Sequence, residues 1–437
     1  MVREQRSTDL RRRKERVVLL GLITPGSAVD RDQPLAELAL LAKTAGADVV
    51  GAVSQKAGHF NASTYVGSGK AREVRALAAS TDADTIICDH DLTPGQVRNL
   101  ESVVDRKVVD RSELILDIFA SHARTKQAKL QVELAQLEYT YPRLAGMWKH
   151  FERLEGAIGT RGPGETQLET DRRLVRRRAD KLRRELDSIQ KRIERQIEAR
   201  HGLFNVALVG YTNAGKSTLM NALTGAGVGV EDKLFATLDT KTARWEVAGH
   251  RWAVLSDTVG FIRRLPHHLV ASFHATLEGA TQADLLLHVA DASHPHCEDQ
   301  IESVEQVLAE IGCAGRPTLT VLNKIDAAGD DGRLLMLKER CPDHVVVSAL
   351  RGDGLDDLRD AVVARLSDRF AEVKVTADQT NGRLLAFLRG HTQIVDEAER
   401  DGRIHVTALV DRNLLGQLRT MAGPDAFQDR DGTDAEL

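Results

Sequence analysis

The stretch GYTNAGKST, residues 210–218, constrains this chain more than any other. It follows the apolar run FNVALV and precedes a helical pattern, so the loop is expected to join a strand to a helix. Gly210 and Gly215 allow backbone N–H groups to turn inward around a phosphate, and Lys216 adds a cation for the β and γ phosphates. The hydroxyl of Ser217 is a candidate ligand for Mg²⁺. The chain is therefore predicted to contain a phosphate-loop α/β domain.

A second motif is expected to contact the metal and the γ-phosphate. D-x-x-G runs from Asp257 to Gly260 at the end of the apolar strand RWAVLSD; the carboxylate would hold Mg²⁺ through water and the Gly260 amide would touch the γ-phosphate. A threonine must close over both from the intervening segment EDKLFATLDTKTAR, and we predict Thr237, with Thr240 as the alternative. The predicted catalytic residues are Lys216, Thr237 and Gly260, and the predicted metal ligands are Ser217, Thr237 and Asp257.

A third motif selects the base. In TVLNKID, N-K-x-D spans Asn323 to Asp326, and the Asp326 carboxylate can accept two hydrogen bonds from the N–H groups of guanine. Adenine would leave buried polar groups unpaired there, so the predicted nucleotide is GTP. In VSAL, the amide of Ala349 can meet the guanine oxygen. The predicted nucleotide-binding residues are Gly210, Tyr211, Thr212, Asn213, Ala214, Gly215, Lys216, Ser217, Thr218, Phe235, Ala236, Thr237, Leu238, Asp257, Thr258, Val259, Gly260, Asn323, Lys324, Asp326, Ser348, Ala349 and Leu350.

The residue after D-x-x-G predicts how fast GTP is hydrolysed. Ras-like enzymes place a water-orienting Gln there. This chain has Phe261, which cannot orient water, so we expect slow intrinsic hydrolysis that a partner stimulates. Asn213 could help to ligate a monovalent cation such as K⁺ beside the phosphates, or it could make an ordinary loop hydrogen bond.

At 437 residues the chain is too long for one core, and its patterns divide it into several regions. Strand-like and helix-like runs alternate before and within the phosphate-loop region, which is typical of parallel α/β sheets. The fold class is α/β, with an N-terminal parallel-sheet domain, an antiparallel helical pair, a phosphate-loop GTPase domain and a small C-terminal α+β module. The predicted regions are a basic extension at 1–16, the N-terminal domain at 17–121, the helical pair at 122–200, the GTP-binding domain at 201–368, and the C-terminal module with an acidic disordered tail at 369–437.

The helical pair carries a basic face and a glycine-rich loop at residues 156–164. Apolar residues from Val175 to Ile193 recur in a heptad-like stripe. From Arg172 to Arg200, twelve Arg or Lys stand against five Asp or Glu, which favours a polyanion partner over a merely solvated face. The loop suits a phosphate backbone, although a flexible linker is the simpler alternative. The candidate RNA-binding residues are Arg161, Arg172, Arg173, Arg176 and Arg177.

Composition excludes several classes of protein. No apolar run approaches the ~20 residues of a membrane span, and no signal peptide is expected. The four cysteines lack metal-type or paired spacing and are expected to be reduced thiols in a cytosolic protein. VGSGK, residues 66–70, is predicted to form a turn, with a second phosphate site as the alternative.

Several segments resemble the HflX family of GTPases. These are TYVGSGK, DLTPGQVRNLE, DRSELILDIF, KLQVELAQLEY and, most specifically, GTRGPGETQLETDRR, together with the motifs above. The resemblance extends over residues 15–370. It implies a cytoplasmic, ribosome-stimulated GTPase that binds the large ribosomal subunit and its rRNA with the N-terminal regions, and that splits stalled or idle ribosomes under stress. In LDTKTAR, Thr240 and Lys241 stand where a proline commonly follows LD, which leaves the path of that segment open.

Two other functions remain alternatives: a GTPase of ribosome assembly, and a nucleotide-switched binding module for a protein partner. ATP use by the N-terminal domain is a further family-level possibility. We expect a monomer that requires Mg²⁺.

Overall fold

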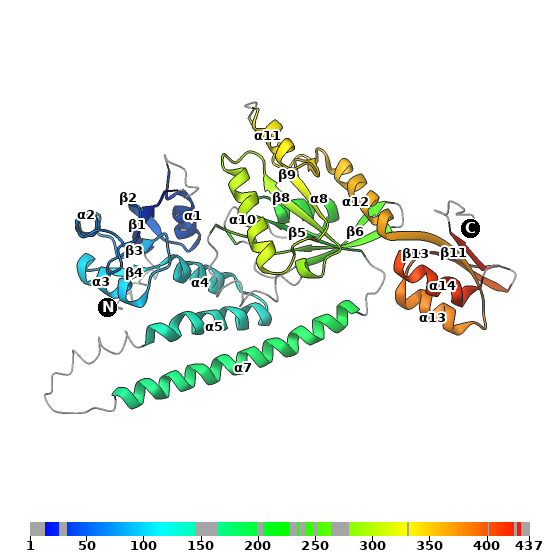
Figure 1. The fold of residues 1–437 in the computed structure, drawn as a ribbon, viewed down its shortest axis with the longest axis horizontal. Coiled ribbons are helices and arrows are strands. Elements are labelled where there is room, and N and C mark those ends of the chain that lie inside the picture. Colours follow the sequence, from blue (N-terminus) through cyan, green and yellow to red (C-terminus); the bar gives the residue numbers. More distant parts are fainter. Residues whose placement is uncertain are drawn as a thin grey trace, which may run out of the picture. The chain divides into compact units, whose positions relative to one another are not determined.

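The computed structural model describes residues 14–25, 33–144, 164–198, 204–227, 234–235, 241–248, 251–263, 279–329, 332–400, 402–423 and 426–429. The chain divides into two compact units, one built mainly on residues 1–123 and 132–180 and the other on residues 181–265 and 269–437. The fold class predicted from the sequence is confirmed in each of its parts (Figure 1).

The N-terminal region is a four-stranded parallel sheet in the order β2-β1-β3-β4, with helices between the strands. Its elements are β1 (Arg16–Ile23), α1 (Ala36–Thr44), β2 (Asp48–Lys56), α2 (Ser68–Ser80), β3 (Thr85–Cys88), α3 (Pro94–Val104), β4 (Lys107–Val109) and α4 (Arg111–His122). The six central residues of β1 are buried, as expected for a parallel strand covered on both faces. Thr93 caps α3 in a reciprocal capping box with Gln96, which fixes where that helix begins.

Two helices follow and run antiparallel: α5 (Lys126–Thr140), continued by the 3-10 turn η1 (Tyr141–Arg143), and α7 (Gly164–Glu198). Arg178 of α7 forms a salt bridge of 2.6 Å with Glu133, and the guanidinium of Arg176 lies over the ring of Tyr141. Residue numbers thus rise along α5 while they fall along α7. Ala179 and Leu182 of the predicted stripe are buried. Most of the predicted glycine-rich loop, residues 156–163, lies outside the described residues.

The predicted GTP-binding domain has a six-stranded sheet in the order β10-β9-β8-β5-β7-β6. All neighbouring strands are parallel except β6, which runs antiparallel to β7. Its elements are β5 (Phe204–Gly210), α8 (Lys216–Thr224), β6 (Lys241–Ala248), β7 (Arg251–Asp257), β8 (Leu285–Asp291), α10 (Cys297–Glu310), β9 (Thr318–Asn323), α11 (Arg333–Arg340), β10 (His344–Val346) and α12 (Leu355–Arg369). The carboxyl ends of β5, β7 and β9 share one edge, where a doubly wound fold binds its ligand.

The C-terminal module is an antiparallel sheet in the order β12-β13-β11-β14. Its elements are β11 (Phe370–Asp378), α13 (Gly382–His391), β12 (Gln393–Arg400), β13 (Arg403–Asp411), η2 (Arg412–Leu414), α14 (Leu415–Ala422) and β14 (Phe427–Asp429). This β-α-β-β-α-β order is the ferredoxin-like arrangement. The predicted disordered tail from residue 430 onward lies outside the described residues.

Two buried phenylalanines and a partly exposed arginine connect this module to the predicted GTP-binding domain. The ring of Phe370 meets that of Phe204 edge-on, with centroids 6.1 Å apart. Arg369 pairs with Asp284, which precedes β8, and its Nε lies 3.1 Å from Asp411 Oδ2 at the end of β13. One arginine therefore holds carboxylates from both parts.

Candidate nucleotide-binding site

The phosphate loop requires the backbone that its sequence allows. Gly210 and Gly215 have φ angles of +148° and +94°, and Asn213, a residue that tolerates the left-handed region, has +62°. A Cβ atom on Gly210 would lie 2.1 Å from the carbonyl oxygen of Val289, and one on Gly215 would lie 2.3 Å from Asn323 Nδ2. Both glycines are therefore needed because neighbouring elements leave no room for a side chain.

The Lys216 ammonium lies inside the curve of this loop. Its Nζ donates to the carbonyl oxygens of Gly210 and Tyr211, at 2.9 and 2.7 Å, and the residue is only 6% exposed. Burial lowers the pKa of Lys216 to about 8, and the nearby carboxylate of Asp257 partly opposes that shift. A cation in such a site gains strongly from a bound anion, because burial has removed most of its hydration.

Ser217 and Asp257, two of the predicted metal ligands, are brought together. Ser217 Oγ donates to Asp257 Oδ2 at 2.6 Å, and Asp257 is fully buried at the end of β7. A hydroxyl and a carboxylate are hard oxygen donors of the kind that Mg²⁺ prefers, so these two residues fit the predicted ion. The third predicted ligand, Thr237, lies outside the described residues.

The D-x-x-G segment packs directly on the phosphate loop. A Cβ atom on Gly260 would lie 2.8 Å from Thr212 Cα and 3.0 Å from Lys216 Nζ, so only glycine fits there. Thr258 ties the segment to β5, because its hydroxyl donates to the carbonyl oxygen of Leu208 at 2.7 Å. The backbone at Gly260 is thus held beside the lysine ammonium.

The N-K-x-D and S-A-L motifs meet at the same edge of the sheet. Asn323 joins them: its Nδ2 donates to the carbonyl oxygen of Ala214 at 2.9 Å, and its Oδ1 accepts from the amide of Ala349 at 3.0 Å. Ser348 Oγ donates to Asp326 Oδ1 at 2.6 Å, and this hydrogen bond is the main cause of the lowered pKa of Asp326. Asp326 is therefore a carboxylate at neutral pH, able to accept hydrogen bonds from a base.

Lys324 closes the phosphate loop from the outside. Its Nζ donates to the carbonyl oxygen of Asn213 at 2.7 Å and pairs with Asp291 at 2.8 Å. Leu350, also predicted to bind nucleotide, is 79% exposed. Ala236, Thr237 and Leu238 lie outside the described residues, whereas Phe235 is described and buried.

Three family models match consecutive parts of the chain. Residues 32–120 match "GTP-binding GTPase N-terminal", residues 122–200 match "GTP-binding GTPase Middle Region", and residues 205–324 match "50S ribosome-binding GTPase". A protein named GTPase HflX from Lacrimispora saccharolytica is 43% identical over 424 residues, which make up 96% of this chain and 99% of that protein. The chain belongs to the HflX family. It is accordingly a GTP-hydrolysing enzyme.

Two further proteins are also similar over most of their length. GTPase HflX from Escherichia coli strain K12 is 46% identical over 361 residues, 81% of this chain and 84% of that protein. A GTP-binding protein from Sulfolobus solfataricus, solved in complex with GDP, is 28% identical over 80% of this chain and 98% of that chain, with a TM-score of 0.43.

Four of the five candidate RNA-binding arginines of this HflX-family chain lie along α7. Arg173, Arg176 and Arg177 are exposed, and Arg172 is half-buried. The Arg176 guanidinium is 5.2 Å from the centroid of the Tyr141 ring, so part of its surface packs against η1. Arg161 lies outside the described residues.

Sequence reasoning missed a buried polar cluster in the N-terminal region. Asp110, which is fully buried, accepts hydrogen bonds from Tyr139 Oη at 2.9 Å, from an Arg143 guanidinium nitrogen at 3.0 Å, and from the amides of Leu92 and Glu113. Burial raises the pKa of Asp110, although the hydrogen bonds from the Glu113 and Leu92 amides and the charge of Arg143 lower it. The cluster ties the end of α5 and η1 to the carboxyl end of β4.

We predict that Tyr139→Phe destabilises this region measurably. The variant removes one hydrogen bond to a buried charged group, so the free energy of unfolding should fall by about 2 kcal/mol. Urea denaturation followed by circular dichroism measures the change. Tyr141→Phe, a hydroxyl deletion two residues away, is the matched control; an equal loss in both variants would contradict a specific role for the Asp110 cluster.

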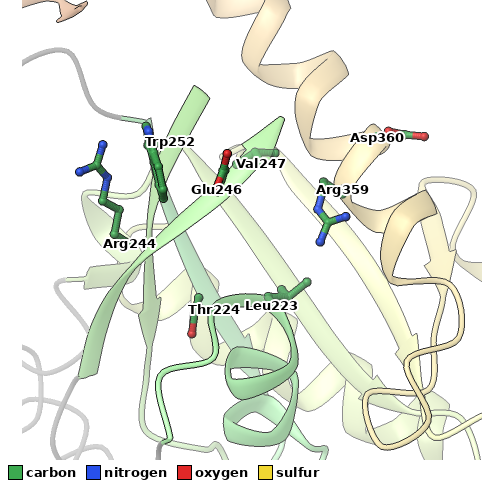
Figure 2. A pocket seen from close by; sticks show the side chains of 8 residues that line it. All are labelled: Leu223, Thr224, Arg244, Glu246, Val247, Trp252, Arg359 and Asp360. Carbon is green, nitrogen blue, oxygen red and sulfur yellow. The ribbon is translucent and has the colours of Figure 1, made fainter. Parts of the chain in front are cut away.

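A separate hollow of about 700 Å³ lies on the GTPase domain (Figure 2). Its walls come from the end of α8, the β6–β7 hairpin and α12, and it is lined by Leu223, Thr224, Arg244, Glu246, Val247, Trp252, Arg359 and Asp360. The Arg244 guanidinium stacks 3.9 Å from the centroid of the Trp252 ring. None of the described residues that line it belongs to the predicted nucleotide-binding set, so these walls are separate from the predicted GTP site.

The described part of the chain contains no helix long and apolar enough to cross a bilayer, and no group of three or more His, Cys, Asp or Glu side chains placed to hold a metal ion. The four cysteines are buried free thiols.

Proposed function

We propose that this chain is a cytoplasmic, monomeric GTPase that binds the large ribosomal subunit in its GTP-bound form and splits stalled or idle ribosomes. The predicted nucleotide, metal and RNA contacts, and the predicted domain boundaries, are part of this proposal. The match of residues 205–324 to a family described as "50S ribosome-binding GTPase" supports the choice of partner.

The observation that carries the proposal is the exposed arginine face of α7. Arg173, Arg176 and Arg177 are exposed and lie close together along α7. From Arg172 to Arg200, twelve Arg or Lys stand against five Asp or Glu, which suits a polyanion such as rRNA. GTP binding would order the Thr237 and Gly260 segments, α7 and its neighbouring loop would dock on rRNA, and hydrolysis would release the factor.

Phe261 supports dependence on the partner. Its side chain is 1% exposed, so the residue after D-x-x-G is packed into the protein and offers no polar group to an attacking water. Ser217 and Asp257 would hold Mg²⁺, which would neutralise charge on the phosphates. Lys216 would bind the β and γ phosphates, and a ribosomal contact would complete the arrangement for hydrolysis.

The test compares GTP hydrolysis and ribosome splitting in wild type and in the triple variant Arg173→Gln/Arg176→Gln/Arg177→Gln. We expect large subunits to stimulate wild-type hydrolysis and the variant to lose stimulation by ~10-fold or more, because each lost phosphate contact weakens binding to rRNA. The salt dependence of binding should fall as well. Light scattering of intact ribosomes measures splitting.

The matched control is Arg383→Gln/Arg389→Gln/Arg419→Gln, which removes three exposed arginines from the C-terminal module. It should retain stimulation. If large subunits do not stimulate the wild type, the proposal fails, and an RNase-insensitive protein partner becomes the better candidate. If they stimulate hydrolysis without splitting, a role in ribosome assembly is favoured.

A further inference from the structure

We propose that Tyr211 is a positioning residue for the GTPase reaction: its hydroxyl holds the segment after D-x-x-G on the phosphate loop and thereby sets the preference for GTP over GDP. The inference rests on the proposed contact between the Gly260 amide and the γ-phosphate. It does not depend on the ribosome.

Three hydrogen bonds join residues 210–212 to residues 261–263, and we call this set the latch. The amide of Phe261 donates to the carbonyl oxygen of Gly210 at 3.1 Å, and the amide of Thr212 donates to the carbonyl oxygen of Phe261 at 2.7 Å. These two form a parallel bridge between Tyr211 and Phe261. The third runs from the amide of Arg263 to Tyr211 Oη, at 2.7 Å.

The latch is partly shielded from water, since Arg263 and its hydrogen bond to Tyr211 are half-buried and the two aromatic residues are buried. Tyr211 is 8% exposed and Phe261 is 1% exposed. A hydrogen bond in such surroundings meets little competition from water, and a buried amide left without its acceptor costs free energy. Two of the three bonds join backbone atoms and would form with many sequences. The third requires a tyrosine, so it is the part of the latch that this sequence specifies.

The latch positions Gly260, which directly precedes it. The position of a Cβ on Gly260 is 3.0 Å from Lys216 Nζ, so the Gly260 backbone lies next to the ammonium expected to bind the γ-phosphate. A γ-phosphate oxygen held by Lys216 would then lie beside the Gly260 backbone, and the Gly260 amide would donate to it in the GTP-bound form. GDP lacks this phosphate and gains nothing from the latch.

The experiment measures dissociation constants of the ribosome-free protein for GDP and for a non-hydrolysable GTP analogue, in wild type and Tyr211→Phe. One lost hydrogen bond corresponds to about a fivefold change in an equilibrium constant. We expect the affinity for the GTP analogue to fall about fivefold while that for GDP changes by less than about twofold. Hydrogen exchange at the amide of Arg263 should become faster.

Two controls isolate the latch. Tyr139→Phe removes a buried tyrosine hydroxyl from the N-terminal region and should leave the ratio of the two affinities unchanged. In a double-mutant cycle with Gly260→Ala, which displaces the backbone at that position, the additional effect of Tyr211→Phe should disappear.

An unchanged ratio, or an equal loss of affinity for both nucleotides, would overturn the inference, since the hydroxyl would then serve only the stability of the loop. Neither result would affect the proposed ribosomal function, which is judged by stimulation and splitting.

Discussion

Lys216→Ala is expected to abolish GTP hydrolysis, with and without ribosomes. Nζ of Lys216 is the one side-chain cation inside the phosphate loop among the described residues, and it already points at the loop carbonyls. Loss of a preorganised group that stabilises transition-state charge typically costs ~100- to 1,000-fold in rate, and here the binding of the phosphates would weaken as well. Phosphate release at saturating GTP, together with nucleotide affinity, measures both effects.

The folding of Lys216→Ala must be measured separately. The structure predicts in which direction its stability relative to wild type changes with pH. The folded pKa of about 8 lies below the unfolded value of 10.5, so the buried ammonium destabilises the nucleotide-free protein below pH 8. Between these two values the unfolded chain binds more protons, so the stability of wild type relative to Lys216→Ala should rise with pH. Melting temperatures at pH 7 and pH 9.5 test this. A variant that hydrolyses GTP normally would refute the assignment of the loop.

Asp326→Asn is expected to convert a guanine site into a xanthine site. The carboxylate would accept two hydrogen bonds from guanine, whereas the amide would present a donor to one of these N–H groups. Two hydrogen bonds to a charged group are worth about 3 kcal/mol or more, so the affinity for GTP should fall ~100-fold and that for xanthosine triphosphate should rise. Competition binding with both nucleotides measures the exchange of preference.

Ser348→Ala is the informative control for this base pocket. It removes the hydroxyl that donates to Asp326 at 2.6 Å but keeps the carboxylate. GTP should therefore bind more weakly by a smaller factor, and xanthosine triphosphate should gain nothing. If Asp326→Asn left GTP binding intact, the base pocket would have to be sought elsewhere.

Buried strands and the loops that follow them were predictable from the sequence. FNVALV, RWAVLSD and TVLNK are continuous apolar runs, and each ends in a motif, so the sheet and the edge that carries the site could be inferred together. The edge strands β6 and β12 were not predicted. They carry many charged side chains, as in KTARWEVA and QIVDEAER, and one face or edge meets solvent, so the apolar signal is weak.

Polar contacts between distant segments could not be predicted at all. Asp110 meets Tyr139 and Arg143, about thirty residues further along the chain, and no periodicity reports such a meeting. The latch is similar: the tyrosine was visible within the motif, but its partner is a backbone amide, which has no sequence signature. Sequence therefore predicted the strands and loops that gather at one edge of the sheet better than it predicted the polar contacts that hold them there.

The contacts of Arg369 and Phe370 determine which end of the G domain the C-terminal module touches. Arg369 pairs with Asp284 just before β8, and Phe370 packs against Phe204 at the start of β5. The phosphate loop follows the opposite end of β5. The loops expected to move when a γ-phosphate binds lie at the other end of β5, one strand length from the contacts of Arg369 and Phe370. The ferredoxin-like module therefore contacts the G domain at the end of the sheet opposite the phosphate loop, and these contacts leave the nucleotide edge uncovered.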